Sequence, residues 1–393
     1  MKKTLIISAV IISVIIFFYY LSGRTANVTH GFTSYYVSSR ILLEEEDFSK
    51  AYDTAYFNLK IRNYGIENVR DLPNNFPTNS LMLVPVSGLK PGDAKVIWTA
   101  LNVVFYFTSI LLLLNVFNIQ FNTDTGLFLL VISLLFLPVY HGLQLGQAYV
   151  FLLFLFTLNL YGLKKDKTWL ISVPLALIIV LKGYGLFPLI ALGLLKKWKS
   201  MFTVLLTAVL IILIAVPVTG VYSWNIYFNE VLLKTGENPY ASYTAFQTLN
   251  SFIRHVFGLS SYPVIALMLI TASTAVFFLM KKHTRGRYSM LLIYSAFAAL
   301  NILFAPIAED YHYALLLPVV FGTGKIIFEN YKKINTEIII FIVSLFIISF
   351  PFNYKGLNNA SFPLILLAYP VLYGGILMIL LSVRVFNSGK NIA

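Results

Sequence analysis

The stretch KKWKSMFTVLLTAVLIILIAVPVTG, residues 196–220, decides the fold class of this chain. Three lysines stand at its start, and residues 201–220 carry no charge at all. A helix needs about 20 apolar residues to cross the hydrocarbon core of a bilayer. This stretch therefore predicts a transmembrane helix with a basic anchor at one end.

Similar apolar runs recur along the whole chain. They are approximately residues 4–22, 94–117, 125–141, 148–163, 168–181, 184–195, 201–220, 262–280, 288–305, 313–328, 338–352 and 362–383. Of the 393 residues, 58% are hydrophobic and 11% are charged, against roughly 45–50% and about 25% in soluble domains. We predict an all-α polytopic membrane protein with about twelve transmembrane helices, forming a single integral membrane domain over residues 1–393.

The lysines and arginines predict the orientation of these helices. With the N-terminus in the cytoplasm, every tight basic cluster falls on the cytoplasmic side, namely 164–167, 196–199, 281–287 and 330–333. This is the positive-inside pattern of multi-pass proteins of a plasma or inner membrane. The net charge of +13 is thus a topology signal, and we expect no nucleic-acid partner.

Two long loops then lie outside, at about residues 23–91 and 221–261. The first contains TSYYVSSRILLEEEDF, residues 33–48, an amphipathic segment. Its aromatic and acidic residues predict interfacial helices at the headgroup layer. Most of the unusual polar side chains of the chain fall in these outer segments, which predicts a site on the outer face.

The densest acid–base cluster is AEDYH, residues 308–312. A carboxylate within reach of a histidine is a plausible pair of base and orienting group. The alternative is that such residues simply sit among the lipid headgroups, and Lys182 equally can extend to the interface. The chain has no cysteine, no phosphate-binding loop, no dinucleotide fingerprint and no HExxH motif. We therefore expect no cofactor and no metal.

Six segments in order resemble the polyprenol-phosphate-dependent membrane glycosyltransferases of family 87, in the GT-C fold class. They begin with FTSYYVSSRILLEEEDFSKAYD (32–53), NFPTNSLMLVPVSGLKPGDAKVIWTALN (75–102) and LQLGQAYVFLLFLFTLNLYGL (143–163). They continue with LALIIVLKGYGLFPLIALGLLKKWK (175–199), FQTLNSFIRHVFG (246–258) and APIAEDYHYALLLP (305–318). The resemblance covers most of residues 1–320.

The resemblance implies a membrane hexosyltransferase, with mannose as the best-known sugar. It would move the sugar from a polyprenyl-phosphate donor to a lipid or glycan acceptor on the outer face. The matching residues that we assign to substrate binding are Lys182, Arg254, Gln147, Tyr35, Tyr36 and Asn250. For catalysis we name Asp310 or His30 as the base, with His312 orienting it or contacting phosphate. Lys182 and Arg254 would neutralise the phosphate, so no metal is required.

Two departures from the family pattern leave other functions open. Gly31 stands where the family has the Asp that activates the acceptor, and Tyr149 replaces an Asn after Gln147. A non-catalytic binder of lipid-linked glycans, or a transporter or flippase of lipid-linked solutes, are the alternatives. Transport predicts polar groups near mid-membrane, whereas those of this chain gather at one face.

Overall fold

The computed structural model describes residues 2–23, 25–71, 74–232, 243–259, 287–330 and 334–388. Within these ranges the chain is all-α, as predicted. The predicted span at 262–280 lies outside the described residues. The other predicted runs each coincide with one helix or with two consecutive helices.

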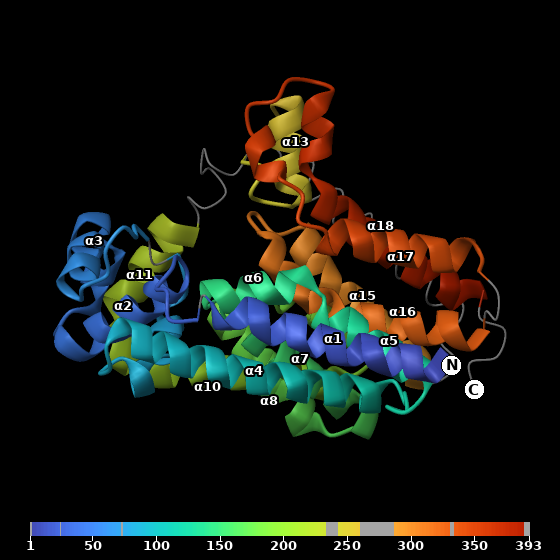
Figure 1. The fold of residues 1–393 in the computed structure, drawn as a ribbon. Helices are drawn as coiled ribbons and strands as arrows, with labels where there is room; N and C mark the ends of the chain where they lie inside the picture. The colour runs from blue at the N-terminus through green and yellow to red at the C-terminus, as the bar shows by residue number, and fades with distance from the viewer. Residues whose placement is uncertain are drawn as a thin grey trace.

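The helices of the main bundle are α1 (Lys2–Ser22), α4 (Pro91–Val116), α5 (Asp124–Leu134), α6 (Leu137–Leu145), α7 (Tyr149–Lys165), α8 (Thr168–Lys182), α9 (Leu186–Leu194), α10 (Trp198–Thr219), α15 (Arg287–Leu303), α16 (Leu317–Asn330), α17 (Thr336–Ser349) and α18 (Pro370–Ser388). Most of them run side by side, with both termini at the same end of the bundle (Figure 1). Buried leucine, phenylalanine and isoleucine side chains from these helices form one large core.

Four helical segments in the described ranges are long and apolar enough to cross a membrane: Thr4–Ser22, Pro91–Val116, Trp198–Thr219 and Asp310–Asn330. The pair α5 and α6 adds a fifth if the two count as one span with a bend of 42°. Helices α8, α15, α17 and α18 are apolar but shorter. The chain is therefore a multi-pass membrane protein, and the number of twelve spans stays a prediction.

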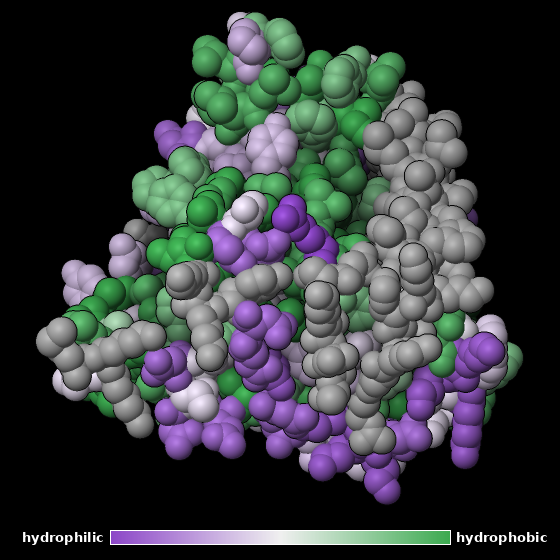
Figure 2. Space-filling model, turned by 90° about the vertical axis from the view of Figure 1, so that its right-hand side faces the viewer, coloured by the Kyte–Doolittle hydropathy of each residue, from purple (hydrophilic) through white to green (hydrophobic). Residues whose placement is uncertain are grey.

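The surface of the bundle fits a lipid environment. On α10, Phe202, Leu206 and Ile214 are all more than half exposed, which apolar residues on a water-facing helix would rarely be. At the end that carries the termini, hydrophilic side chains gather across the lower part of the surface (Figure 2). Lys165 at the end of α7 and Lys199 at the start of α10 are exposed, and Lys164 bonds to Asn118 just beyond the end of α4.

The first long loop folds into a unit of its own at the opposite end of the bundle (Figure 1). It consists of α2 (Phe32–Glu44), the 3₁₀ turn η1 (Phe48–Tyr52), α3 (Thr54–Asn63), and the 3₁₀ turns η2 (Pro77–Leu81) and η3 (Val84–Val86). Residues 32–39 of α2 are all buried, in a second core that includes Trp98 and Ala148 of the bundle. The predicted amphipathic helix is thus enclosed by protein over residues 32–39, and only Leu43 and Glu44 at its end are exposed.

The second long loop contributes α11 (Val221–Ile226), the π-helical turn η4 (Tyr227–Leu232) and α13 (Leu249–Phe257). The rings of Tyr227 and Phe76 lie 4.5 Å apart, which joins η4 to the first loop. Helix α13 packs instead beside the segment after α17, which contains the 3₁₀ turns η7 (Tyr354–Leu357) and η8 (Leu364–Ala368). There His255 bonds to the Tyr369 hydroxyl at 2.8 Å.

Candidate functional site

The end of α8 is fixed by the first long loop. The Thr78 hydroxyl and the Asn79 amide donate to the carbonyls of Val180 and Leu181. These carbonyls lie in the last turn of the helix, where no backbone donor is available within the helix. Gly183, with φ +70°, then ends the helix, as glycine commonly does. Lys182 is therefore held at a defined place.

The Lys182 ammonium lies among aromatic rings. It is 4.9 Å from the ring centroid of Tyr35 and 5.6 Å from that of Tyr149, and it donates to Asn75 Oδ1. Cation–π contacts of this kind stabilise a partly desolvated charge. We call the group around this ammonium, formed by Lys182, Tyr35, Gln147, Tyr149 and His312, the Lys182 cluster.

Gln147 enters this cluster from the turn after α6. Gly146 (φ +65°) ends α6. The backbone N–H of Gln147 donates to the Gly142 carbonyl at 2.9 Å, which makes this end of the helix a Schellman turn. The side chain of Gln147 accepts from the Tyr35 hydroxyl at 2.9 Å and donates to the Tyr311 hydroxyl at 3.3 Å. Burial raises the pKa of Tyr35 well above its ordinary value, so this hydroxyl stays a donor.

His312 comes from the 3₁₀ turn η6 (Asp310–Leu316). Its Nδ1 accepts from the Glu309 amide at 3.0 Å, so the proton of the neutral ring is on Nε2. The ring lies 3.9 Å from the Tyr149 ring and 4.6 Å from the Tyr311 ring. His312 is thereby fixed as a donor beside Lys182, whose charge acts on it.

Sequence reasoning missed Asp71, which lies in the first loop. Its Oδ2 accepts from the Gly31 amide at 2.8 Å, and its charge acts on both Lys182 and Tyr35. Gly31 has φ +83°, and a Cβ there would overlap the side chain of Gln147. The structure therefore places a carboxylate against the very residue where the sequence lacks the expected Asp. The residues around Asp71 in the sequence give no sign of this contact, because Gly31 and Asp71 are 40 residues apart.

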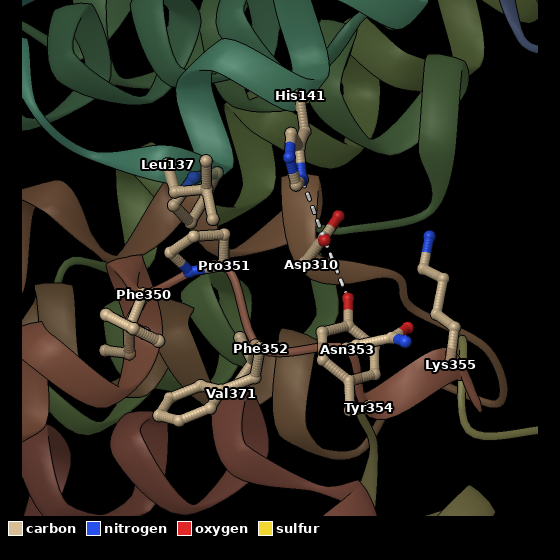
Figure 3. Close-up of a pocket in the computed structure, with 12 residues that line it drawn as sticks. Leu137, His141, Asp310, Phe350, Pro351, Phe352, Asn353, Tyr354, Lys355 and Val371 are labelled. Carbon is tan, nitrogen blue, oxygen red and sulfur yellow. Dashed lines mark hydrogen bonds and ion pairs between the residues drawn. The ribbon is translucent and has the colours of Figure 1, made fainter. Parts of the chain in front are cut away.

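Asp310 faces away from the Lys182 cluster. Its Oδ2 accepts from His141 Nδ1 at 2.8 Å and from the Tyr354 hydroxyl at 2.7 Å (Figure 3). The prediction that His312 orients Asp310 is therefore corrected: the histidine in contact is His141, on α6. The physical reason is the 3₁₀ geometry of η6, in which side chains two positions apart point in different directions.

Four other predicted residues lie outside the Lys182 cluster. The Tyr36 hydroxyl donates to the Leu89 carbonyl at 2.7 Å within the second core, that of the first long loop. Asn250 donates to the Pro306 carbonyl at 2.8 Å, which ties α13 to the segment before η6. Arg254 lies on the same helix α13. His30 is exposed in the turn before α2, next to Gly31.

The Lys182 cluster brings together a partly buried lysine side chain, hydrogen-bond donors and flat aromatic faces. Such a set suits an anionic group attached to a sugar, because a phosphate needs the charge and sugar rings pack on aromatic faces. In the part of the chain that the structure describes, no three His, Asp or Glu side chains form a group that could hold a metal ion.

The fold and the site define a multi-pass helical membrane protein with a cationic, aromatic site at one end of its bundle. Residues 76–306, more than half of the chain, match glycosyltransferase family 87. The chain belongs to this family of GT-C membrane glycosyltransferases, so it is a glycosyltransferase. The searches of curated proteins and of solved structures gave no match.

Proposed function

We propose that this glycosyltransferase moves a hexose from a polyprenyl-phosphate donor to a hydroxyl of a lipid or glycan acceptor at the outer face of the membrane. The observation that carries the proposal is the Lys182 ammonium, held between Tyr35 and Tyr149. A lipid phosphate is a poor leaving group unless its developing negative charge is stabilised, and fixed cations do this best in sites with little water.

On the donor side, Lys182 bonds to the phosphate. His312 donates to a phosphate oxygen from Nε2, because its Nδ1 is occupied by the Glu309 amide. Gln147 and the tyrosine rings contact the sugar. The hexose is mannose by family resemblance.

On the acceptor side, we propose Asp71 as the base. The acceptor oxygen attacks the anomeric carbon, the bond from that carbon to the phosphate oxygen breaks, and the acceptor proton passes to the Asp71 carboxylate. The lipid phosphate leaves with the bonding electron pair and stays in contact with Lys182. One displacement inverts the anomeric carbon and needs no covalent intermediate.

The bases named from the sequence are less suited to this step. Asp310 is only 6% exposed in its side chain, and its Oδ2 already accepts two hydrogen bonds. Proton transfer requires hydrogen-bond reach to the acceptor. His30 is exposed and next to Gly31, so it serves in this proposal as a contact for the acceptor.

The test uses the purified protein in nanodiscs with a polyprenyl-phosphate mannose and, in parallel, with a nucleotide-linked mannose. The proposal expects release of polyprenyl phosphate with the first donor and no turnover with the second. Turnover of the nucleotide donor alone would overturn the assignment of the donor class. A transporter would move the intact lipid-linked sugar between leaflets without releasing the carrier phosphate.

A further inference from the structure

A pocket of about 220 Å³ lies on the other side of η6 from the Lys182 cluster. It is bounded by α6, by η6 and by the segment that joins α17 to η7 (Figure 3). No residue of the Lys182 cluster lines it. The volume is below the roughly 300–1,000 Å³ of sites that enclose a whole small molecule, so the pocket has room for part of a ligand.

The two sides of this pocket differ in chemistry. Leu137, Phe350, Phe352 and Val371 form an apolar side, and Lys355 stands opposite them (Figure 3). His141 lies between the two sides. A pocket with one apolar and one polar side fits an amphiphile, with its chain against the first and its head against the second.

The polar side offers donors to an incoming head group. Asp310 is nearly buried, and its Oδ2 is already occupied by His141 and Tyr354. The Lys355 side chain is 53% exposed, and its partner Glu309 is 3.5 Å away. The His141 side chain is 35% exposed. The groups open to a ligand are thus the Lys355 ammonium and the His141 ring, which suit an anion.

The apolar side continues onto the lipid-facing surface. Ile339, Ile342, Val343 and Phe346 on α17 are each between 41% and 54% exposed. Their spacing places them along one side of the helix. The ring of Phe346 lies 4.8 Å from that of Phe350, which lies 4.6 Å from that of Phe352. A continuous apolar track therefore leads from the side of α17 into the pocket.

We propose that this pocket binds the head and first units of a single-chain lipid phosphate, with the rest of the chain along α17. The phosphate bonds to Lys355 and His141, and the chain packs on Phe350 and Phe352. The site is separate from the Lys182 cluster, so a lipid phosphate binds here whether or not the Lys182 cluster is occupied. This proposal concerns binding alone and stands apart from the proposed transfer reaction. In an enzyme that consumes a lipid-phosphate donor, such a site can hold the released carrier.

The test is photo-crosslinking with farnesyl phosphate that carries a diazirine on its chain, using the full-length protein in nanodiscs. Labelled peptides are identified by mass spectrometry. We expect labelling within residues 346–355. Lys355→Glu should raise the half-saturating probe concentration about ten- to hundredfold. This is the range for loss of a hydrogen bond between charged groups. His141→Gln should shift that concentration in the same direction.

The matched control is Lys50→Glu, because Lys50 is 49% exposed and lies 3.4 Å from Glu45, much as Lys355 lies near Glu309. It should leave the labelling unchanged, and so should Lys182→Met, which acts on the other cluster. Unlabelled farnesyl phosphate should compete, and farnesol or inorganic phosphate at equal concentration should not. Labelling unaffected by Lys355→Glu, equal competition by farnesol, or loss of labelling in Lys182→Met would each overturn the proposal. Thermal melting of each variant shows whether it is folded.

Discussion

Asp71 places a carboxylate against Gly31, the position at which this chain lacks the Asp of the family motif. The sequence shows the loss at position 31, and the structure shows a carboxylate returning to the Gly31 amide from 40 residues away. Lys182, Gln147 and Tyr35 were named from the sequence because each stands in a recognisable motif, and the structure brings the three together, while their roles in binding stay a prediction. Asp71 and Asn75 were not, because only the folding of the first loop brings them to Lys182.

Asp71→Asn tests the base directly. The amide oxygen can still accept from the Gly31 amide, so the fold should persist with little change in melting temperature. Loss of the base should lower the rate of sugar transfer on the order of 10²–10⁴-fold. The control is Asp47→Asn, since Asp47 only caps η1 by accepting from the Ser49 amide. An Asp71→Asn enzyme as fast as wild type would remove Asp71 from the mechanism.

Among the elements, the helices were predictable and their breaks were not. The run 125–141 was predicted as one span, but α5 and α6 meet at a bend of 42°. Pro138 in the first turn of α6 is the reason, because proline cannot donate to the preceding turn and crowds it. The run 313–328 likewise begins inside η6. The breaks set the directions of His141 on α6 and of Asp310 and His312 on η6. The spacing of apolar residues does not reveal such breaks.

The turn before α2 packs against the turn after α6, and glycines permit this contact. Gly31→Ala should lower the free energy of unfolding by about 1–2 kcal/mol, because alanine disfavours the positive φ at this position. The added methyl group should also displace the Gln147 side chain and so reduce the rate of transfer. Gly65→Ala is the matched control: Gly65 has φ +74° but open space around its Cα. It should show the same loss in thermal stability with normal transfer. Equal effects of both variants on transfer would contradict the role given to this contact.

For the whole molecule, the first long loop is not a linker but a part that positions the site. The first loop holds the end of α8 through Thr78 and Asn79, and the bundle supplies Lys182 and Gln147. Composition and charge pattern were sufficient to predict a helical multi-pass protein. They could not show that Asp310 and His312 face different sides, since that depends on packing between distant helices.

The absence of cysteine from the chain makes its orientation directly measurable. Single cysteines at Glu46 in the first loop and at Lys199 in the first turn of α10 would both be exposed. In intact cells a membrane-impermeant maleimide should label the cysteine at 46 and not that at 199, because basic loops stay in the cytoplasm. After permeabilisation both should react. Labelling of position 199 alone in intact cells would reverse the predicted topology and place the Lys182 cluster inside.

The most direct test of the central claim is the rate of polyprenyl-phosphate release by Lys182→Met, measured beside Lys199→Met in the same nanodiscs. Methionine keeps the apolar stem at position 182 and removes the charge that faces the leaving phosphate. The account predicts a loss on the order of 10²–10³-fold for Lys182→Met, the usual cost of removing one group that stabilises transition-state charge, and a normal rate for Lys199→Met. Equal rates for the two folded variants would contradict it.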